Sequence, residues 1–178
     1  MSTSLEQTIA QAKAAYEDED YAQAAELYKN AQKEYTAALD PLAAAEMANN
    51  CSVALLKAGD AKGSLQAVEG TDVVFSQAND VKRQAMALAN KAAALESLKR
   101  YPDALELYEQ SNELLKGIGE NELRAYVLKS ISTVQLRQGK QLEAIASMQA
   151  SLDNQPNPGV KDRFVKRLIQ QVFKLLNR

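Results

Sequence analysis

The chain has 178 residues, enough for one domain, and Ala, Leu, Glu, Lys and Arg supply 87 of them, a composition typical of an all-helical protein. A formal charge of −2 excludes a strong overall attraction to nucleic acid or to a membrane surface. Because the sequence has no histidine and a single cysteine, it lacks an internal disulfide and the residue that most often serves as general base or metal ligand.

The first residues of the chain show neither a basic leader nor an apolar core of a signal peptide, so a cytoplasmic location is expected. No apolar run approaches the roughly 18 residues that a membrane span needs. We therefore expect no stable membrane insertion, and no interleaved basic and aromatic surface indicates nucleic-acid binding.

Short turns divide the chain into helices. Asp40 followed by Pro41 is an N-cap with proline at the first helical position, and Gly59 and Gly139 suit left-handed helix C-caps. The pattern predicts nine helices, over residues 3–18, 21–38, 42–58, 61–78, 80–99, 102–116, 120–138, 141–153 and 160–177.

The chain repeats itself every forty residues without a gap. The segment 20–24 aligns with 60–64, 100–104 and 140–144, and each segment ends in a small residue that is followed four residues later by a larger one. Such a pair lets the preceding helix approach closely and fills the adjoining groove. The small residues are Ala24, Ser64, Ala104 and Ala144, and the larger ones are Tyr28, Val68, Tyr108 and Met148.

This pattern, with Pro156 eight residues after Met148, resembles the tetratricopeptide repeat (TPR) family in a long, forty-residue variant. The resemblance implies an all-α solenoid, a right-handed superhelix of four TPR-like helix hairpins whose first helices line a concave face, closed by a C-terminal capping helix. The expected organisation is one domain, 1–178, with repeats at about 3–39, 41–79, 80–118 and 119–157 and a capping helix at 160–177.

Few residues carry the chemistry of an enzyme. Cys51 lies at a core position, where a thiol acts as a small hydrophobe, and the acidic run 17–20 reads as a solvated turn in which Asp20 caps the next helix. Tyr21, Tyr28 and Tyr35 stand seven residues apart, and Tyr101 and Tyr108 repeat the first two of them 80 residues later. All five are interpreted as packing residues. We therefore expect neither catalysis nor a metal or cofactor.

The candidate site is the inner face of the first helices. Asn50, Asn90 and Ser130 stand at one repeat position, and amides can donate to and accept from a peptide backbone. The alternative is that these asparagines bond neighbouring helices. The predicted peptide-binding residues are Lys13, Tyr16, Asn50, Val53, Lys57, Met86, Asn90, Ala93, Tyr126, Lys129, Ser130, Thr133 and Arg137.

TPR proteins that grip a C-terminal carboxylate place lysine and arginine where this chain has Met86 and Asn90, so that mode is not expected. The resemblance implies a non-catalytic protein–protein interaction scaffold, or adaptor, that binds a peptide or protein segment on its concave face. The alternative is a structural or assembly protein that associates with itself through its terminal surfaces, for example as a homodimer.

The last predicted helix has a broad apolar face and a basic opposite side, and it is expected to cap the last repeat. A basic amphipathic helix can also lie on an anionic membrane, enter a partner's groove or pair across a two-fold axis. The apolar residues of this helix are Phe164, Val165, Leu168, Ile169, Val172, Phe173 and Leu176.

Overall fold

The computed structural model describes residues 3–176, leaving out the side chains of Thr3, Val172, Phe173, Leu175 and Leu176. Within this range the chain forms ten helices and no strand, so the all-α prediction is confirmed. The helices are α1 (Thr3–Glu17), α2 (Tyr21–Ala37), α3 (Pro41–Lys57), α4 (Ala61–Val68), α5 (Thr71–Gln77), α6 (Val81–Ser97), α7 (Tyr101–Gly117), α8 (Asn121–Arg137), α9 (Gln141–Asn154) and α10 (Val160–Leu176).

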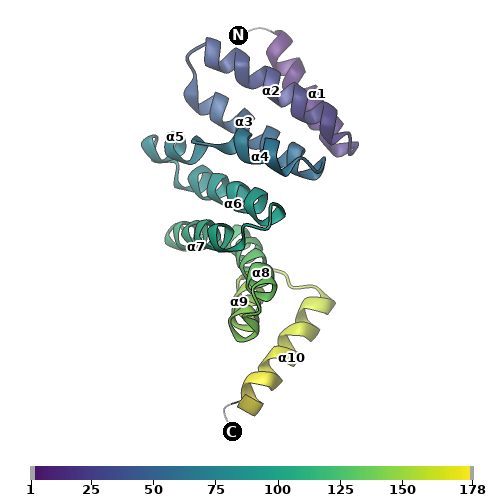
Figure 1. Cartoon of the computed structure of the whole chain (residues 1–178), viewed down its shortest axis with the longest axis vertical. Coiled ribbons are helices and arrows are strands. Elements are labelled where there is room, and N and C mark those ends of the chain that lie inside the picture. Colours follow the sequence, from purple (N-terminus) through teal and green to yellow (C-terminus); the bar gives the residue numbers. More distant parts are fainter. Residues whose placement is uncertain (1–2, 177–178) are drawn as a thin grey trace.

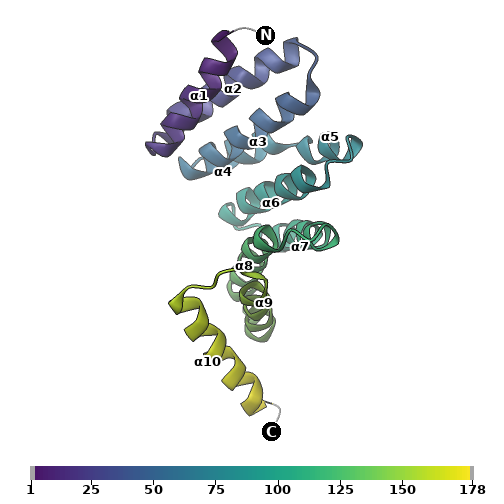
Figure 2. The same cartoon turned by 180° about the vertical axis from the view of Figure 1, so that it is seen from behind.

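The helices stack as consecutive antiparallel hairpins along the long axis of the molecule, with α1 and α2 at one end and α8 and α9 toward the other (Figure 1). The reverse view shows the same order of layers (Figure 2). This arrangement is the predicted α-solenoid.

Close helix contacts lie at the small residues of the repeat. Ala24, Ala104 and Ala144 are buried. The hydroxyls of Ser52 and Ser64 lie 2.9 Å apart between α3 and α4, and Ser132 Oγ donates to the Ala144 carbonyl oxygen at 2.7 Å. Small side chains thus let paired helices approach within hydrogen-bonding distance, as the repeat pattern predicts.

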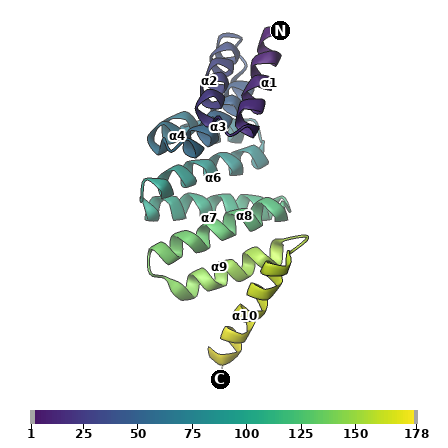
Figure 3. The ribbon, with the colours of Figure 1, turned by 90° about the vertical axis from the view of Figure 1, so that its right-hand side faces the viewer.

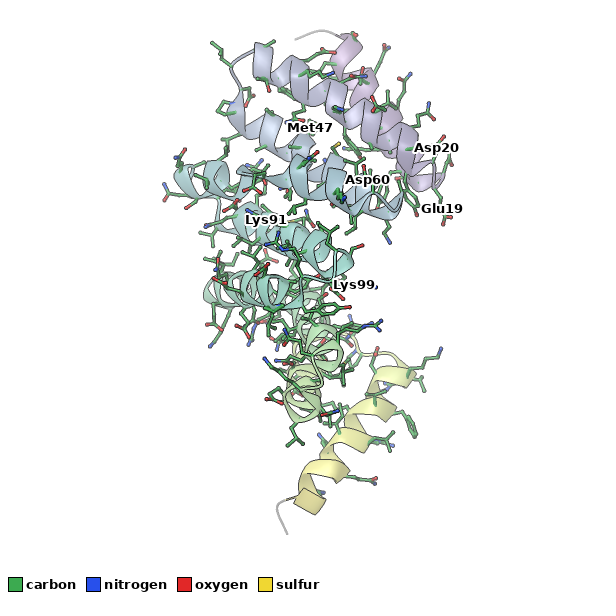
Figure 4. All side chains as sticks on the ribbon, in the orientation of Figure 1. Glu19, Asp20, Met47, Asp60, Lys91 and Lys99 are labelled. Carbon is green, nitrogen blue, oxygen red and sulfur yellow. The ribbon has the colours of Figure 1, made fainter. Side chains whose placement is uncertain are left out.

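Capping carboxylates precede four helices, α2, α3, α4 and α6, and two of them, Asp20 and Asp60, are labelled in Figure 4. The side chains of Asp20, Asp40, Asp60 and Asp80 each accept from the backbone N–H three residues later, which satisfies one of the free donors of the first turn. The helices α7, α8 and α9 begin after Arg100, Glu120 and Lys140, which make no such bond.

The second repeat departs from the predicted single helix at 61–78. The chain is extended at Glu69 and left-handed at Gly70, with φ of 77°, so α4 ends and α5 begins as a separate short helix. Thr71 Oγ1 then donates to the Val68 carbonyl oxygen at 2.8 Å and lies 3.4 Å from Asn49 Oδ1 on α3. A left-handed glycine followed by a β-branched residue that bonds back to the helix end favours termination over continuation.

The last helix, α10, projects from the end of the stack (Figure 3). It contacts α9 along one edge, where Ile169 is buried and Lys166 Nζ lies 2.5 Å from Asp153 Oδ1. The Lys166 ammonium lowers the pKa of the Asp153 carboxyl. Phe164, Val165 and Leu168 remain exposed, and the predicted apolar residues Val172, Phe173 and Leu176 lie outside the described side chains.

Candidate concave binding surface

The first helices of the third and fourth repeats, α6 and α8, present equivalent residues forty positions apart. Met86 pairs in this register with Tyr126, and Asn90 pairs with Ser130. Residues three, four and seven positions apart share one helix face, so each helix carries a row of these side chains. The rows are Met86, Asn90, Ala93 and Ser97 on α6 and Tyr126, Ser130, Thr133 and Arg137 on α8.

The two rows meet at a cavity of about 520 Å³. The structure brings the predicted residues Ala93, Tyr126, Ser130 and Arg137 together here. Sequence reasoning did not identify the other residues of its lining. They are Leu56 from the end of α3, Glu96 and Ser97 of α6, Lys99 of the following turn, and Tyr101 and Tyr108 of α7.

A buried tyrosine forms part of the wall of this cavity. Tyr108 is almost wholly buried, and its hydroxyl donates to Glu96 Oε2 at 3.1 Å. Burial raises the pKa of Tyr108, and the nearby Glu96 carboxylate raises it further, so the phenol stays protonated at neutral pH. The site therefore has an uncharged aromatic side chain in its wall, beside one carboxylate.

Tyr126 links this cavity to two others. Its side chain is 67% exposed, although it is aromatic. It lines a small cavity of about 110 Å³ with Met86 and Asn90, and a larger one of about 450 Å³ with Lys129 and Asp162. An exposed aromatic side chain between three hollows offers a large apolar contact surface to a partner.

The polar residues of the rows differ in what they can offer. Ser130 Oγ donates to the Tyr126 carbonyl oxygen at 3.4 Å and Thr133 Oγ1 to that of Lys129 at 3.1 Å, so these hydroxyls bond their own helix. Within residues 3–176 the side-chain amides of Asn50 and Asn90 make no hydrogen bond. They are half-buried and can donate to and accept from a ligand.

The remaining predicted residues lie away from this cavity. Tyr16 packs edge-to-face on Tyr21, with ring centroids 5.2 Å apart, and so contributes to the α1–α2 contact. Lys13 and Lys57 are exposed and Val53 is half-buried. From α3 it is Leu56 that reaches the cavity. The cavity therefore takes its predicted lining residues from α6 and α8 alone, and the predicted residues of α1 and α3 do not line it.

One of the lining residues that the sequence analysis did not name could have been identified from the repeat alignment. Ser97 stands forty residues after Lys57 and forty before Arg137, so extending the repeat alignment by one helical turn identifies it. Glu96 and Lys99 have no such signal, because their approach to α8 depends on the angle between successive hairpins. Tyr101 and Tyr108 were interpreted as packing residues, and they both pack and line the cavity.

A second hollow follows from the break in the second repeat. It has a volume of about 550 Å³ and lies between the end of α2, the start of α3 and the α4–α5 junction. Its lining includes Leu39, Ala44, Gly70 and Val74. The sequence analysis did not predict this hollow, because it placed one continuous helix at 61–78.

None of the helices described over residues 3–176 is long and apolar enough to cross a bilayer.

Comparisons with known proteins agree with this architecture. The crystal structure of nearly identical TPR-like repeats assigned to a kinesin light chain of Podosopora anserina superposes with a TM-score of 0.71 at 14% identity, covering 97% of this chain and 92% of that one. BtubC (BKLC) from P. vanneervenii superposes with a TM-score of 0.65 at 15% identity, covering 96% and 84%. At such identities the likeness concerns the fold.

Sequence comparison is narrower in extent. No curated protein sequence gives a significant match. The family model of the tetratricopeptide repeat matches residues 83–157, which span α6 to α9 and include the rows of the cavity. Residues 83–157 are therefore similar in sequence to tetratricopeptide repeats, and the described chain has a TPR-like fold, as its forty-residue pattern predicted.

Proposed function

We propose that this protein is a non-catalytic scaffold that binds an extended peptide segment of a partner across α6 and α8. Tetratricopeptide-type repeats generally mediate protein–protein interaction, and solenoids use their extended concave surfaces for binding. The observation that carries the proposal is the 520 Å³ cavity, because it combines an exposed aromatic side chain, exposed basic side chains and repeat-related positions at one place.

The charges of the cavity favour one kind of segment. Arg137 and Lys99 are exposed at its edge, whereas the carboxylate of Glu96 already accepts the Tyr108 hydroxyl. Tyr126 offers a flat apolar surface beside them. A segment with an apolar side chain near an acidic one fits this arrangement, with Asn90 available to its backbone.

The absence of catalysis is part of the same proposal. Cys51, the only nucleophilic thiol, is buried and its Sγ lies 3.4 Å from the Ala25 carbonyl oxygen. Burial raises the pKa of Cys51 to about 11, so the thiolate is scarce at neutral pH. With no histidine in the chain, no imidazole can activate it.

A displayed library of random peptides, selected on the full chain, tests the proposal. The selected peptides are expected to bind the wild type and to lose about 30-fold or more in affinity on Tyr126→Ala or Arg137→Ala, the loss typical of central interface residues. Leu142→Ala and Arg100→Ala are matched controls, because both side chains are exposed outside the cavity.

The double variant Asn50→Ala, Asn90→Ala separates backbone recognition from side-chain recognition. If it weakens every selected peptide about equally, the amides hold the peptide backbone. Peptides whose affinity is indifferent to Tyr126, Arg137 and both asparagines would place the binding surface elsewhere and overturn the proposal.

A further inference from the structure

The described side chains of α10 form an apolar side and a basic side, and the contact with α9 leaves most of both sides exposed. At 100° per residue, Phe164, Val165 and Leu168 fall on one half of the helix, and Arg163 and Arg167 fall on the other. Phe164, Leu168 and Val165 are 62%, 46% and 38% exposed. Ile169, at the edge of this half, is buried on the side that faces α9.

The charge of this segment has a single sign. From residue 163 to the end of the sequence there are five basic residues and no acidic one. Lys166 is paired with Asp153 of α9, while Arg163, Arg167 and Lys174 are exposed. The helix therefore projects from the stack (Figure 3), and it exposes the apolar side chains of Phe164, Val165 and Leu168 as well as these three basic side chains.

The chain's own acidic end does not suit this surface. Residues 1–40 carry eight acidic and three basic side chains, so they complement α10 in charge. In the described part of that region, however, Leu39 is the one exposed large apolar side chain. A second copy offering its first hairpin would neutralise the arginines and leave Phe164 and Leu168 in water.

Pairing two α10 helices would cover the apolar side chains but would leave the basic charges unsatisfied. Face-to-face contact would bury Phe164 and Leu168, but it would bring two segments of net charge about +5 together, because each holds six basic residues and one acidic residue over 160–178. An anionic lipid surface matches both halves at once. It provides phosphate and carboxylate groups for the arginines and an acyl layer for the apolar side chains.

We propose that α10 binds the surface of an anionic membrane, lying in the plane of the headgroups with Phe164, Val165 and Leu168 turned toward the acyl chains. Arg163, Arg167 and Lys174 contact the headgroups. The helix lies flat, since a seventeen-residue helix of which half is charged or polar neither spans nor enters the hydrocarbon core. The edge contact of Ile169 and Lys166 with α9 keeps the solenoid attached beside the membrane.

Flotation of the full chain with vesicles tests this proposal. At about 0.1 M salt, the protein is expected to float with phosphatidylcholine vesicles containing about 30% phosphatidylserine, and not with pure phosphatidylcholine. Raising the salt to about 0.5 M should weaken binding several-fold, because exposed charges are then screened.

Two variants and two matched controls identify the surface. Leu168→Ser should weaken binding about tenfold, because one leucine leaves the acyl layer. Arg167→Glu should weaken it at least about fivefold. Leu142→Ser and Lys62→Glu change an exposed apolar and an exposed basic residue outside α10 and outside the cavity, and they should leave flotation unchanged. All four positions are exposed, so unchanged circular dichroism is expected and should be checked.

Three outcomes overturn the proposal. The first is an absence of flotation with phosphatidylserine vesicles, and the second is flotation that both α10 variants leave unchanged. The third is a doubling of mass in light scattering that Phe164→Ser abolishes while flotation is absent, which would assign the apolar face to a second copy of the chain. Peptide binding at the α6–α8 cavity is measured separately, and its failure would leave the membrane result unaffected.

Discussion

The hydroxyl of Tyr108 on α7 donates a 3.1 Å hydrogen bond to Glu96 Oε2 on α6, and both residues line the 520 Å³ cavity. This bond makes one residue both a packing element of the third repeat and a part of the candidate site. It also makes the stability of the protein depend on pH, since burial and Glu96 raise the pKa of the phenol above its ordinary 10.0.

Tyr108→Phe tests that dependence. At pH 8 we expect the variant to be less stable by about 0.5–1.5 kcal/mol, the usual contribution of one hydrogen bond. The unfolded tyrosine ionises near pH 10 while the folded one stays protonated, so wild-type stability falls as pH rises through 10. The difference in free energy of unfolding between wild type and Tyr108→Phe should therefore become smaller above pH 10. Urea denaturation of both proteins at several pH values measures this difference. A difference that stays constant across pH 10 would contradict the raised pKa of Tyr108.

Ala104→Leu should destabilise the fold. Ala104 is fully buried where α7 meets its neighbours, and three added carbons overpack such a contact at a cost of about 1–3 kcal/mol. Ala150 is half-buried and packs against the core of the third and fourth repeats, so the exposed Ala146 of the same helix serves as the control. Ala146→Leu should change the free energy of unfolding by less than about 0.5 kcal/mol. Equal effects of the two substitutions would refute the repeat register.

Lys140→Asp should stabilise the last hairpin. Lys140 precedes α9 at the position where Asp20, Asp40, Asp60 and Asp80 cap earlier helices, and it makes no capping bond. A carboxylate that accepts from the backbone N–H of Glu143 should raise stability by about 0.5–2 kcal/mol. Asp20→Ala, which removes an existing cap, should lower it by a similar amount. Chemical denaturation of both variants checks the pair, and a neutral Lys140→Asp would mean that α9 frays without affecting global stability.

The substitution Leu39→Gly should also stabilise the folded protein. Leu39 has φ of 58°, a left-handed conformation that costs a non-glycine residue about 1–2 kcal/mol, and its exposed side chain has little packing to lose. We expect a gain of about 0.5–1 kcal/mol after the greater flexibility of unfolded glycine is deducted. Ala38→Gly, at the neighbouring residue with φ of −81°, should instead destabilise. A loss at both positions would show that the side chain of Leu39 packs in solution.

The sequence by itself determined the local features of this protein. The forty-residue period, the small residues at the helix contacts and the aspartate caps are encoded within one or two helical turns, so their physical basis is contained in neighbouring residues. These features were sufficient to place the helices to within one or two residues at most boundaries. They also led to the prediction that the first helices of all four repeats line a binding surface.

The tertiary structure decided which of those inner-face residues meet. Arg137 shares a cavity with Lys99 and Leu56 because of the rotation between successive hairpins, a quantity that depends on packing across helices far apart in sequence. The sequence did not indicate that the helix would end at Gly70. That break is accompanied by a contact between Thr71 and Asn49, which lies on a different helix. The exposure of Phe164 and Leu168 followed from the angle at which α10 leaves α9, because an amphipathic pattern predicts an apolar face without stating what covers it.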